Sequence, residues 1–223
     1  MAAGSRTLLP RESHRWSLRA NWVGIMRIIA GTKRGMRLFS PGTMATRPIT
    51  DRVKQSLFNV LENNDLLAGA RVADLFCGIG SLGLEALSRG AAFVTFVEKN
   101  SEIIDVLKEN IGKAGFYDKS RVIHASAFRV GAPAYRGRCH DVVFVDPPYA
   151  STQEVGAGSS LADLLTVLEG QVTDRGVVVV RTHRRVTLLE EYGRFHVVDR
   201  RQWGTMAIVL LQARVDEQQT GGD

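Results

Sequence analysis

From residue 71 onward, short apolar runs alternate with longer stretches in which apolar side chains recur at helical spacing. The runs with the length of strands are RVADLF (71–76), FVTFVE (93–98), RVIHA (121–125), DVVFVD (141–146) and GVVVVRT (176–182). Helical spacing lies near 81–89, 101–114 and 159–169, and a further short helix is expected after the fifth run. This alternation predicts an α/β fold, with a mostly parallel sheet and helices on both of its faces.

A hairpin is predicted on either side of this pattern. MRIIAGTKRGMRLFS (26–40) holds two short apolar runs around a glycine-containing turn, and FHVVDRRQWGTMAIVLLQ (195–212) repeats that arrangement with longer runs. The first predicts a small N-terminal β-hairpin extension and the second a C-terminal antiparallel hairpin. After the first hairpin, TDRVKQSLFNVLENN (50–64) predicts a helix that Thr50 or Asp51 caps.

Composition limits the class of protein. The 223 residues, 44% of them apolar, suffice for one full α/β domain with a large core and a short appendage. No apolar stretch approaches the roughly 20 residues of a membrane span, so no membrane partner is expected. Cys77 and Cys139 stand in unrelated contexts, which excludes a cysteine-rich metal site and favours a reducing compartment such as the cytoplasm. No metal is expected.

The net charge of +6 is unevenly distributed along the chain. Residues 1–25 carry +3 and residues 26–54 carry +6, whereas the remainder carries −3. A basic front end on a neutral-to-acidic body fits a catalytic domain with a grip for nucleic acid, and it fits a solvated charged face equally well. Charge alone does not decide between the two.

The two ends of the chain lack the regular pattern. Residues 1–25 have neither hydrophobic periodicity nor the apolar core of a secretion signal. They contain Arg and Ser and almost no acid, as organelle transit peptides do, but a start codon set too far upstream, with Met26 as the true start, is the favoured explanation. We expect this leader to be disordered and the polar tail 214–223 to be frayed.

A glycine-rich loop joins the first predicted strand to the helix after it. VADLFCGIGSLGLEAL places Gly78, Gly80 and Gly83 in a G-x-G-x-x-G between strand and helix, the context that this nucleotide-binding motif requires. Such glycines let the chain turn tightly and let a ligand approach the main chain. Glu98 ends the second strand, 18 residues past Gly80, where a carboxylate can accept both hydroxyls of a ribose. An adenosine-containing cofactor is therefore predicted.

The glycine loop alone leaves the identity of that cofactor open. A dinucleotide would place its pyrophosphate over the helix N-terminus. S-adenosylmethionine has no phosphate and instead brings a cationic sulfonium and an amino group, which favour a nearby acid. Asp74, at the end of the first strand, is such an acid.

The stretch VFVDPPYAS (143–151) decides between these cofactors. Proline donates no N–H to a sheet, so the buried strand must stop at Asp146, Pro147, Pro148 and Tyr149. As the fourth strand by count, it should lie beside the first, across the point where strand order reverses. Open α/β sheets bind their ligands at that point.

These four residues suit the methylation of a planar amine. The exocyclic amine of a nucleobase is a poor nucleophile until its hydrogens are held. The Asp146 carboxylate and the Pro147 carbonyl are two acceptors for those hydrogens, and the prolines fix them in place. Tyr149 offers a face for an unstacked base, worth about 1–3 kcal/mol. A dehydrogenase has no evident use for this group, so the cofactor predicted is a methyl donor and the catalytic residues are Asp146, Pro147, Pro148 and Tyr149.

The chain resembles the bacterial 16S ribosomal RNA guanine-N2 methyltransferases, class I enzymes that act on the guanine usually numbered 966. The residues that carry the resemblance are MRIIAGTKRGMRL, TRPITDRVKQSLFNVL, DLFCGIGSLGLEALSRGA, FVEKN and VDPPY, in this order between Met26 and about Gln212. The pair TRPxTDRV and DPPY is specific. A glycine loop with D/N-P-P-Y alone also occurs in DNA adenine and protein glutamine methyltransferases.

The resemblance implies a Rossmann-like class I methyltransferase fold with a seven-stranded sheet and S-adenosyl-L-methionine as cofactor. Residues 51–213 would form the catalytic domain, and residues 26–50 would grip RNA and close over the cofactor, with Thr46, Arg47, Pro48 and Thr50 as site candidates. The cofactor-binding residues expected are Asp74, Phe76, Gly78, Gly80, Glu98, Lys99, Ser126, Ala127 and Thr50. Ser126 departs from the family, which usually has Asp or Asn there to contact the adenine amine. A hydroxyl accepts that hydrogen bond more weakly.

The basic hairpin is the expected grip on RNA, because Lys and Arg contacts to phosphates position RNA without reading its sequence. The RNA-binding residues expected are Arg27, Lys33, Arg34, Arg37, Arg47 and Arg52. The predicted reaction transfers a methyl group to N2 of a guanine in 16S ribosomal RNA, with the RNA of the 30S subunit as partner and a monomeric enzyme.

Two alternatives to this function remain. A DNA adenine-N6 methyltransferase would share the loop and the DPPY group, but the chain has no sizeable insertion for reading a duplex. A ribosome-assembly RNA-binding protein with an inactive methyltransferase fold would not need a complete catalytic group, whereas DPPY and Glu98 are both present.

Overall fold

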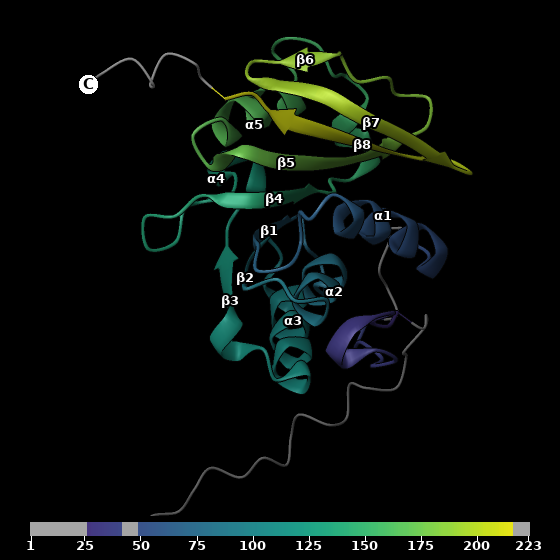
Figure 1. Ribbon diagram of the computed structural model, residues 1–223, viewed down its shortest axis with the longest axis vertical. Coiled ribbons are helices and arrows are strands. Elements are labelled where there is room, and N and C mark those ends of the chain that lie inside the picture. The colour runs from purple at the N-terminus through teal and green to yellow at the C-terminus, as the bar shows by residue number, and fades with distance from the viewer. Residues whose placement is uncertain (1–25, 42–48, 216–223) are drawn as a thin grey trace, which may run out of the picture.

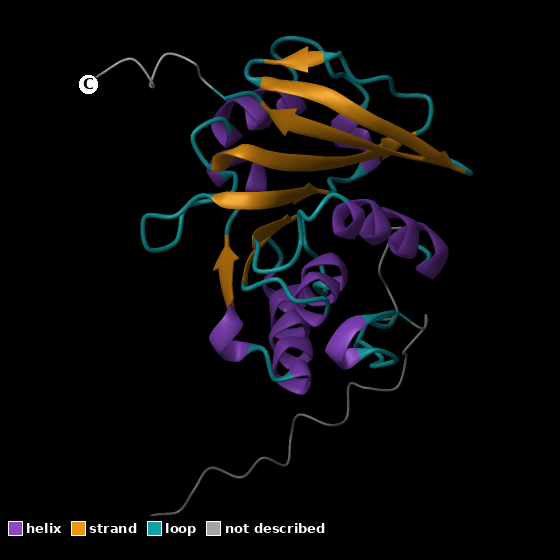
Figure 2. Cartoon of the chain, in the orientation of Figure 1, coloured by secondary structure: helices purple, strands orange, loops and turns teal. Residues whose placement is uncertain are grey.

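A computed structural model describes residues 26–41 and 49–215 of the chain. A single eight-stranded sheet runs through it, in the order β3-β2-β1-β4-β5-β8-β7-β6 (Figures 1 and 2). The parallel strands are β1 (Arg71–Leu75), β2 (Phe93–Glu98), β3 (Ser120–His124), β4 (His140–Val145) and β5 (Val172–His183). Antiparallel pairing then adds β8 (Met206–Ala213), β7 (Phe195–Trp203) and β6 (Glu191–Tyr192).

Helices cover both faces of the sheet, as the pattern predicted (Figure 1). One face carries α1 (Asp51–Asn63), α2 (Ser81–Ser88) and α3 (Ser101–Ala114), and the other carries α4 (Ala127–Val130) and α5 (Ser160–Leu168). The central strand β4 is buried on both sides: Val142 and Phe144 pack with the first group of helices, and Val143 and Val145 with the second. A continuous apolar run is what such a strand requires.

The predicted neighbour of β1 is confirmed. β4 pairs with β1 in parallel register, Val72 opposite Val142 and Leu75 opposite Val145. Both strands therefore end at the same edge of the sheet, and strand order reverses between them. The cap of α1 is also as predicted, since Thr50 Oγ1 accepts a hydrogen bond from Val53 N at 3.4 Å.

Two expectations about the second half of the sheet are wrong. The sheet has eight strands rather than seven, because the two residues of β6 pair with the start of β7 after a turn at Gly193, whose φ of +54° suits glycine. The short helix expected after β5 is absent from the described residues 184–190. There Arg184 N donates to Thr205 O at 2.9 Å, which ties the chain to the β7–β8 turn instead of to a helix.

Several predicted segments lie outside the described residues. They are the leader 1–25, the segment 42–48 with Thr46, Arg47 and Pro48, and residues 216–223 of the tail. The proposed division into leader, hairpin, catalytic domain and tail therefore stays a prediction.

The described part of the N-terminal segment follows a hairpin path but forms only one β-bridge, Arg27 with Arg37. Ile28 N donates to Met36 O at 2.9 Å, and a 3₁₀ turn, Gly31–Lys33, reverses the chain. Gly31 has a φ of +76°, and a Cβ there would lie 1.9 Å from Ser88 O. Only glycine lets the turn approach the end of α2 this closely.

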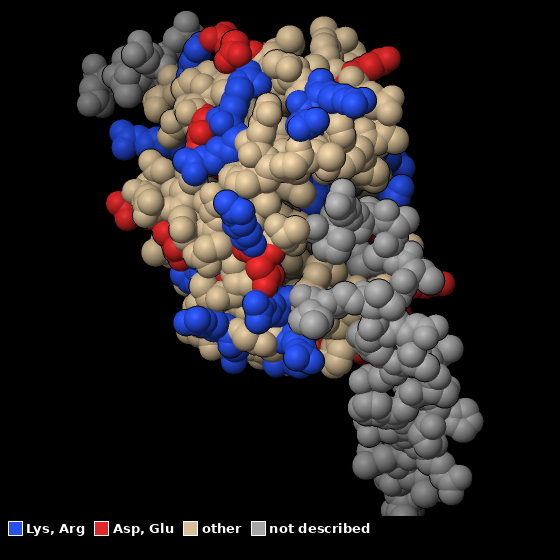
Figure 3. All heavy atoms as spheres, turned by 90° about the vertical axis from the view of Figure 1, so that its right-hand side faces the viewer, with Lys and Arg blue, Asp and Glu red and all other residues tan. Residues whose placement is uncertain are grey.

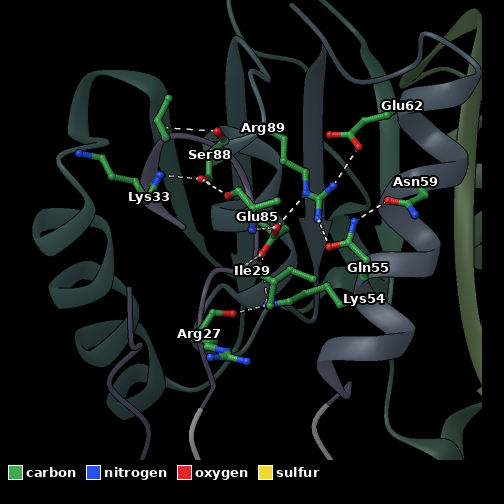
Figure 4. Close-up of polar contacts among 12 residues, drawn as sticks. Arg27, Ile29, Lys33, Lys54, Gln55, Asn59, Glu62, Glu85, Ser88 and Arg89 are labelled. Atoms are coloured by element: carbon green, nitrogen blue, oxygen red, sulfur yellow. Dashed lines mark hydrogen bonds and ion pairs between the residues drawn. The ribbon is translucent and has the colours of Figure 1, made fainter. Parts of the chain in front are cut away.

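Buried polar groups fix this hairpin to the helices (Figure 4). Glu85 on α2 is fully buried and accepts hydrogen bonds from Ile29 N at 2.8 Å and Ala30 N at 3.0 Å. Its carboxylate also pairs with Arg89 Nε at 2.8 Å and lies 3.4 Å from Lys54 Nζ. Lys54 in turn donates to Arg27 O at 2.6 Å. Burial lowers the pKa of Lys54, and Glu85 opposes that shift.

A second anchor comes from α3. Asn110, also fully buried, accepts from Phe39 N at 2.7 Å and donates to Phe39 O and to Ile79 O in the glycine loop. The hairpin, α3 and the loop are thus joined through one side chain. This holds Met26, at the start of the hairpin, near the loop.

Replacing Glu85 by Gln should lower the free energy of unfolding by about 3–5 kcal/mol, because the buried Lys54 would lose its paired carboxylate and the buried Arg89 would keep only the partly exposed Glu62 as a counter-ion. Urea denaturation of the variant and the wild type measures the difference.

Glu62→Gln is the matched control. Glu62 also pairs with Arg89, at 2.9 Å, but its side chain is 42% exposed, so its loss should cost at most about 1 kcal/mol. Equal small losses in the two variants would contradict the anchoring role of Glu85.

Candidate active site

A cavity of about 730 Å³ opens where β1, β2 and β4 end, a size typical of small-molecule sites. All four predicted catalytic residues line it, Asp146, Pro147, Pro148 and Tyr149. Of the predicted cofactor-binding residues, Asp74, Phe76, Gly78, Glu98, Lys99, Ser126 and Ala127 line it as well. The glycine loop and the DPPY residues, more than 60 residues apart in sequence, thus line the same cavity.

The glycine loop has the sharp backbone that its sequence predicted. Phe76, Gly78 and Gly80 have φ values of +57°, +53° and +85°, so the chain reverses within five residues. Gly80 does not line the cavity. It is the residue before α2, and a Cβ there would lie 2.5 Å from Leu107 Cδ1, so its role is to let the loop pack on α3.

Glu98 lies at the end of β2 and its carboxylate is fixed by main-chain donors. Oε2 accepts from Gly78 N at 3.0 Å, and Oε1 accepts from Lys99 N at 2.8 Å and Asn100 N at 2.9 Å. A carboxylate has about four acceptor sites, so roughly one remains for a ligand hydroxyl. If Glu98 accepts both ribose hydroxyls, one hydroxyl must share a carboxylate lone pair with a main-chain N–H group.

Asp74 lies at the base of the loop. Its Oδ2 accepts from Gly83 N, in the first turn of α2, at 2.8 Å. Burial raises the pKa of Asp74 well above its usual range, although the Gly83 hydrogen bond opposes the shift. A cation beside this group would favour its charged form, whereas a pyrophosphate would meet an acid already placed at the helix N-terminus. This arrangement favours a cationic cofactor over a dinucleotide.

Asp146 follows β4 directly and forms an ion pair with Arg181 on β5, between Oδ1 and Nε. Burial raises the pKa of Asp146 to about 6, and Arg181 acts against that rise. The pair holds the carboxylate in one orientation, with Oδ2 as the oxygen that it can offer to a ligand.

Tyr149 begins a short 3₁₀ turn, Tyr149–Thr152, at the cavity wall. Its ring meets the ring of His183 edge to face, with centroids 5.6 Å apart, and the Arg181 guanidinium lies 5.9 Å from its centroid. The basic sequence around His183 predicts a solvated segment, but this histidine is half-buried against the tyrosine. The ring that would stack a base is thus supported from β5.

Some predicted residues have other roles in the structure. Thr50 does not line the cavity, since its hydroxyl caps α1, and its neighbour Ile49 lines the wall instead. Ser126 lines the wall but caps α4 without a side-chain hydrogen bond, so its hydroxyl can face a ligand.

Two residues of the cavity wall, Arg181 and Phe128, contact predicted site residues but were not indicated by the sequence. Arg181 was hidden because it ends an ordinary apolar strand, and its partner lies 35 residues away. Phe128 packs its ring edge against Phe76, with centroids 4.7 Å apart. Its position on the four-residue helix α4 gave no pattern to detect.

The predicted RNA-binding residues are exposed at the N-terminal hairpin and α1, except Lys33, which is half-buried over the ring of Phe116. Arg27 pairs with Asp51 at 2.8 Å, and these two residues line a separate small recess with Gly35 and Arg37. Arg47 lies outside the described residues. Figure 3 views the side on which β4, β5 and β7 end, and Lys and Arg side chains lie over its upper, middle and lower parts, with Asp and Glu side chains among them.

Neither a metal cluster nor a membrane-spanning helix is found in the described part of the chain. Within residues 26–41 and 49–215, no group of three or more His, Cys, Asp or Glu side chains is placed to hold a metal ion. No helix among the same residues is long and apolar enough to cross a membrane.

The residues of the cavity fit S-adenosylmethionine. Asp74, Glu98 and Asp146 give the wall three acids, as a cationic ligand with ribose hydroxyls favours, and Ile103 and Phe128 give it an apolar side suited to an adenine ring. Glu98 would hold the ribose, Asp74 would face the cationic end, and Ser126 would lie near the base.

Comparison with known proteins gives consistent matches. Residues 26–212 match the model of the family described as conserved hypothetical protein 95. The Bacillus subtilis protein YlbH is 34% identical over 197 residues, which are 85% of this chain and 100% of YlbH. The Escherichia coli ribosomal RNA small subunit methyltransferase D is 41% identical over 128 residues, which are 56% of this chain and 61% of that enzyme. The solved structure of the Escherichia coli protein yhhF has a TM-score of 0.71 and 31% identity, and the match covers 86% of this chain and 100% of that one.

The family match begins at the N-terminal hairpin and ends in β8, so it includes every residue of the cavity wall. With the relative from Escherichia coli, it confirms the resemblance to small-subunit ribosomal RNA methyltransferases. The chain therefore belongs to the conserved hypothetical protein 95 family.

Proposed function

We propose that this protein transfers a methyl group from S-adenosylmethionine to the N2 amine of a guanine in small-subunit ribosomal RNA. The observation that carries the proposal is that the Asp146–Tyr149 corner and the glycine loop with Glu98 line the same cavity. A relative that is 41% identical is named a small-subunit ribosomal RNA methyltransferase, which supports the substrate class.

The chemistry follows from the acceptors at the cavity wall. When bound, S-adenosylmethionine supplies an electrophilic methyl group on a positively charged sulfur. Asp146 and the main chain of Pro147 would hold the two hydrogens of the guanine amine, so that its nitrogen lone pair leaves the ring system and points at that methyl carbon. Transfer would form the N–C bond as the C–S bond of the methyl donor breaks, and Asp146 or water would accept the proton that the amine loses.

The edge of guanine that carries N2 presents hydrogen-bond donors, which suit the acceptors of this corner. Its N2 amine and N1–H are adjacent donors, and an ionised Asp146 with a neighbouring carbonyl offers only acceptors. The corner alone does not separate guanine N2 from adenine N6, because DNA adenine methyltransferases share the D/N-P-P-Y group and adenine also presents an amine with two hydrogens. The preference for a guanine in ribosomal RNA rests on the TRPITDRV segment that accompanies DPPY and on the relative named a ribosomal RNA methyltransferase.

Finer features of the substrate are part of the same proposal. The target is the guanine numbered 966 in 16S ribosomal RNA, presented within the 30S subunit to a monomeric enzyme in the cytoplasm. Both cysteines are free thiols, which suits a reducing compartment.

Replacing Asp146 by Asn should reduce methyl transfer to unmodified 30S subunits by about 10²–10⁴-fold, because the amide places a donor where the amine needs an acceptor. Transfer of tritiated methyl groups measures the rate. Affinity for S-adenosylhomocysteine, measured by calorimetry, should remain close to that of the wild type.

Asp163→Asn is the control, because Asp163 is an acid on α5, away from the cavity. It should keep the wild-type rate. An Asp146→Asn enzyme that methylates as fast as the Asp163 variant would rule out this role for the carboxylate, and an inactive wild type would favour a pure RNA-binding protein.

The pH dependence of transfer should report the ionisation of Asp146. Its pKa is raised to about 6, so below that pH the neutral acid predominates, and its proton would compete with the Arg181 contact and with the hydrogen bond from the amine. We expect kcat/KM to rise with pH through a midpoint near 6 and to level off about one unit above it. A flat profile between pH 5 and 8 would contradict the assignment.

Replacing Arg181 by Gln should move this midpoint to higher pH, because the arginine is the cation that favours the ionised carboxylate. Arg175→Gln removes an exposed arginine from the other end of the same strand and should leave the midpoint in place. The same profile in both variants would show that Arg181 does not act through Asp146.

A further inference from the structure

We propose that Arg184 and Arg185 bind the RNA phosphates that flank the target nucleotide, on the β5 side of the cavity. This inference rests on the proposed function and extends its RNA contact to a segment outside the basic hairpin. The two residues directly follow β5, which ends at His183. They therefore lie at the edge of the sheet where the cavity opens.

The charge of this segment is unusual in its context. The arginines around it are paired with acids: Arg181 with Asp146, Arg194 with Asp174, Arg200 with Glu190 and Arg201 with Asp199. Arg184 and Arg185 are both exposed, and no ion pair joins either of them to an acid among the described residues. Two adjacent guanidinium groups without a counter-ion suit phosphates, which each accept hydrogen bonds from such a group.

The main chain holds these arginines in place. Arg184 N donates to Thr205 O at 2.9 Å, and Arg185 N donates to His183 Nδ1 at 3.2 Å. Val186 N then donates to His183 O at 2.9 Å, and Leu188 is buried two residues later. The segment is thus fixed at both of its ends, so its side chains extend from a defined place.

That place is next to the proposed base platform. His183 contacts the ring of Tyr149 edge to face, and consecutive Cα atoms lie about 3.8 Å apart, so the two arginines follow within about 8 Å of chain. A guanine stacked on Tyr149 stays attached to its own sugar and to a phosphate on either side. Those phosphates must pass the mouth of the cavity, and the two arginines follow β5 on that side of the mouth, although neither lines the cavity itself.

The basic hairpin would then hold RNA on the other side of the mouth. Met26 lines the cavity and Arg27 follows it, whereas Tyr149 and Arg181 line the wall on the β4–β5 side. Arginines thus stand on both sides of the opening. This arrangement would grip the strand before and after the extruded nucleotide, and a splayed base in a single strand is the usual target of sequence-specific RNA recognition.

The test compares two double variants that each remove two positive charges. Arg184→Gln with Arg185→Gln removes the proposed contact. Arg136→Gln with Arg138→Gln is the matched control, since both residues are exposed in the turn before β4, at the opposite edge of the sheet. Binding to a fluorescein-labelled RNA stem-loop with a guanine in its loop is measured by anisotropy over a range of salt concentrations.

We expect the Arg184/Arg185 variant to bind this RNA about tenfold more weakly at low salt. Its plot of log affinity against log salt should be less steep by about 1.4, or about 0.7 for each phosphate that is no longer neutralised. The control should keep the affinity and slope of the wild type, and both variants should bind S-adenosylhomocysteine normally. Equal reductions in both variants, or none in either, would overturn the proposal.

The measurement separates this inference from the proposed function, because binding needs no methyl transfer. Weaker binding confined to the Arg184/Arg185 variant, together with an inactive wild type, would support the contact and refute the methyltransferase. An active wild type together with unchanged RNA binding in the Arg184/Arg185 variant would support the methyltransferase and refute the contact. Equal affinity for a DNA duplex of the same length would overturn the assignment to RNA.

Discussion

The proposed active site depends on keeping one carboxylate, Asp146, ionised in a place where burial favours the neutral acid. Burial raises its pKa to about 6, and the ion pair with Arg181 on the neighbouring strand opposes that rise. The carboxylate could not be better solvated without also exposing the reacting amine to water. A partner from β5 stabilises the charge while the carboxylate stays mostly buried. The strand order is what makes this partner available, since β4 lies between β1 and β5.

The same strand order joins the other parts of the site. β1 delivers the glycine loop and β4 the acidic corner at a common edge, and β2 adds Glu98 next to them. The N-terminal hairpin is fixed to this edge by polar rather than apolar contacts, through Glu85 on α2 and Asn110 on α3. Because Asn110 binds both the hairpin and Ile79 of the glycine loop, the segment proposed to grip RNA and the loop proposed to bind the cofactor share a support. A change in the position of either segment would therefore alter the position of the other.

Sequence reasoning found the residues whose roles depend on local pattern. Asp146 and Glu98 each close an apolar strand, and the glycines stand between a strand and a helix, so the cavity could be predicted without coordinates. The same holds for the alternation of strands and helices and for the cap at Thr50. The residues that sequence reasoning missed have roles that depend on partners far away in the sequence. Arg181 gains its role only because β5 lies beside β4, and Glu85 is an ordinary helix residue until the hairpin places two N–H groups against it. The two-residue strand β6 was too short to leave a pattern. The sequence around Arg184 and Arg185 indicates only a solvated segment, because the contact of Arg184 with the β7–β8 turn spans about 20 residues.

The identity of the methylated nucleoside tests the central claim most directly. Unmodified 30S subunits would be incubated with the protein and labelled S-adenosylmethionine, and the 16S ribosomal RNA digested to nucleosides and analysed by mass spectrometry. The account predicts label in N2-methylguanosine alone. Label in N6-methyladenosine would contradict the assignment to guanine, because the corner would then hold the amine of adenine. Label on a ring carbon would contradict the role of the corner, because such a transfer needs no amine to be held.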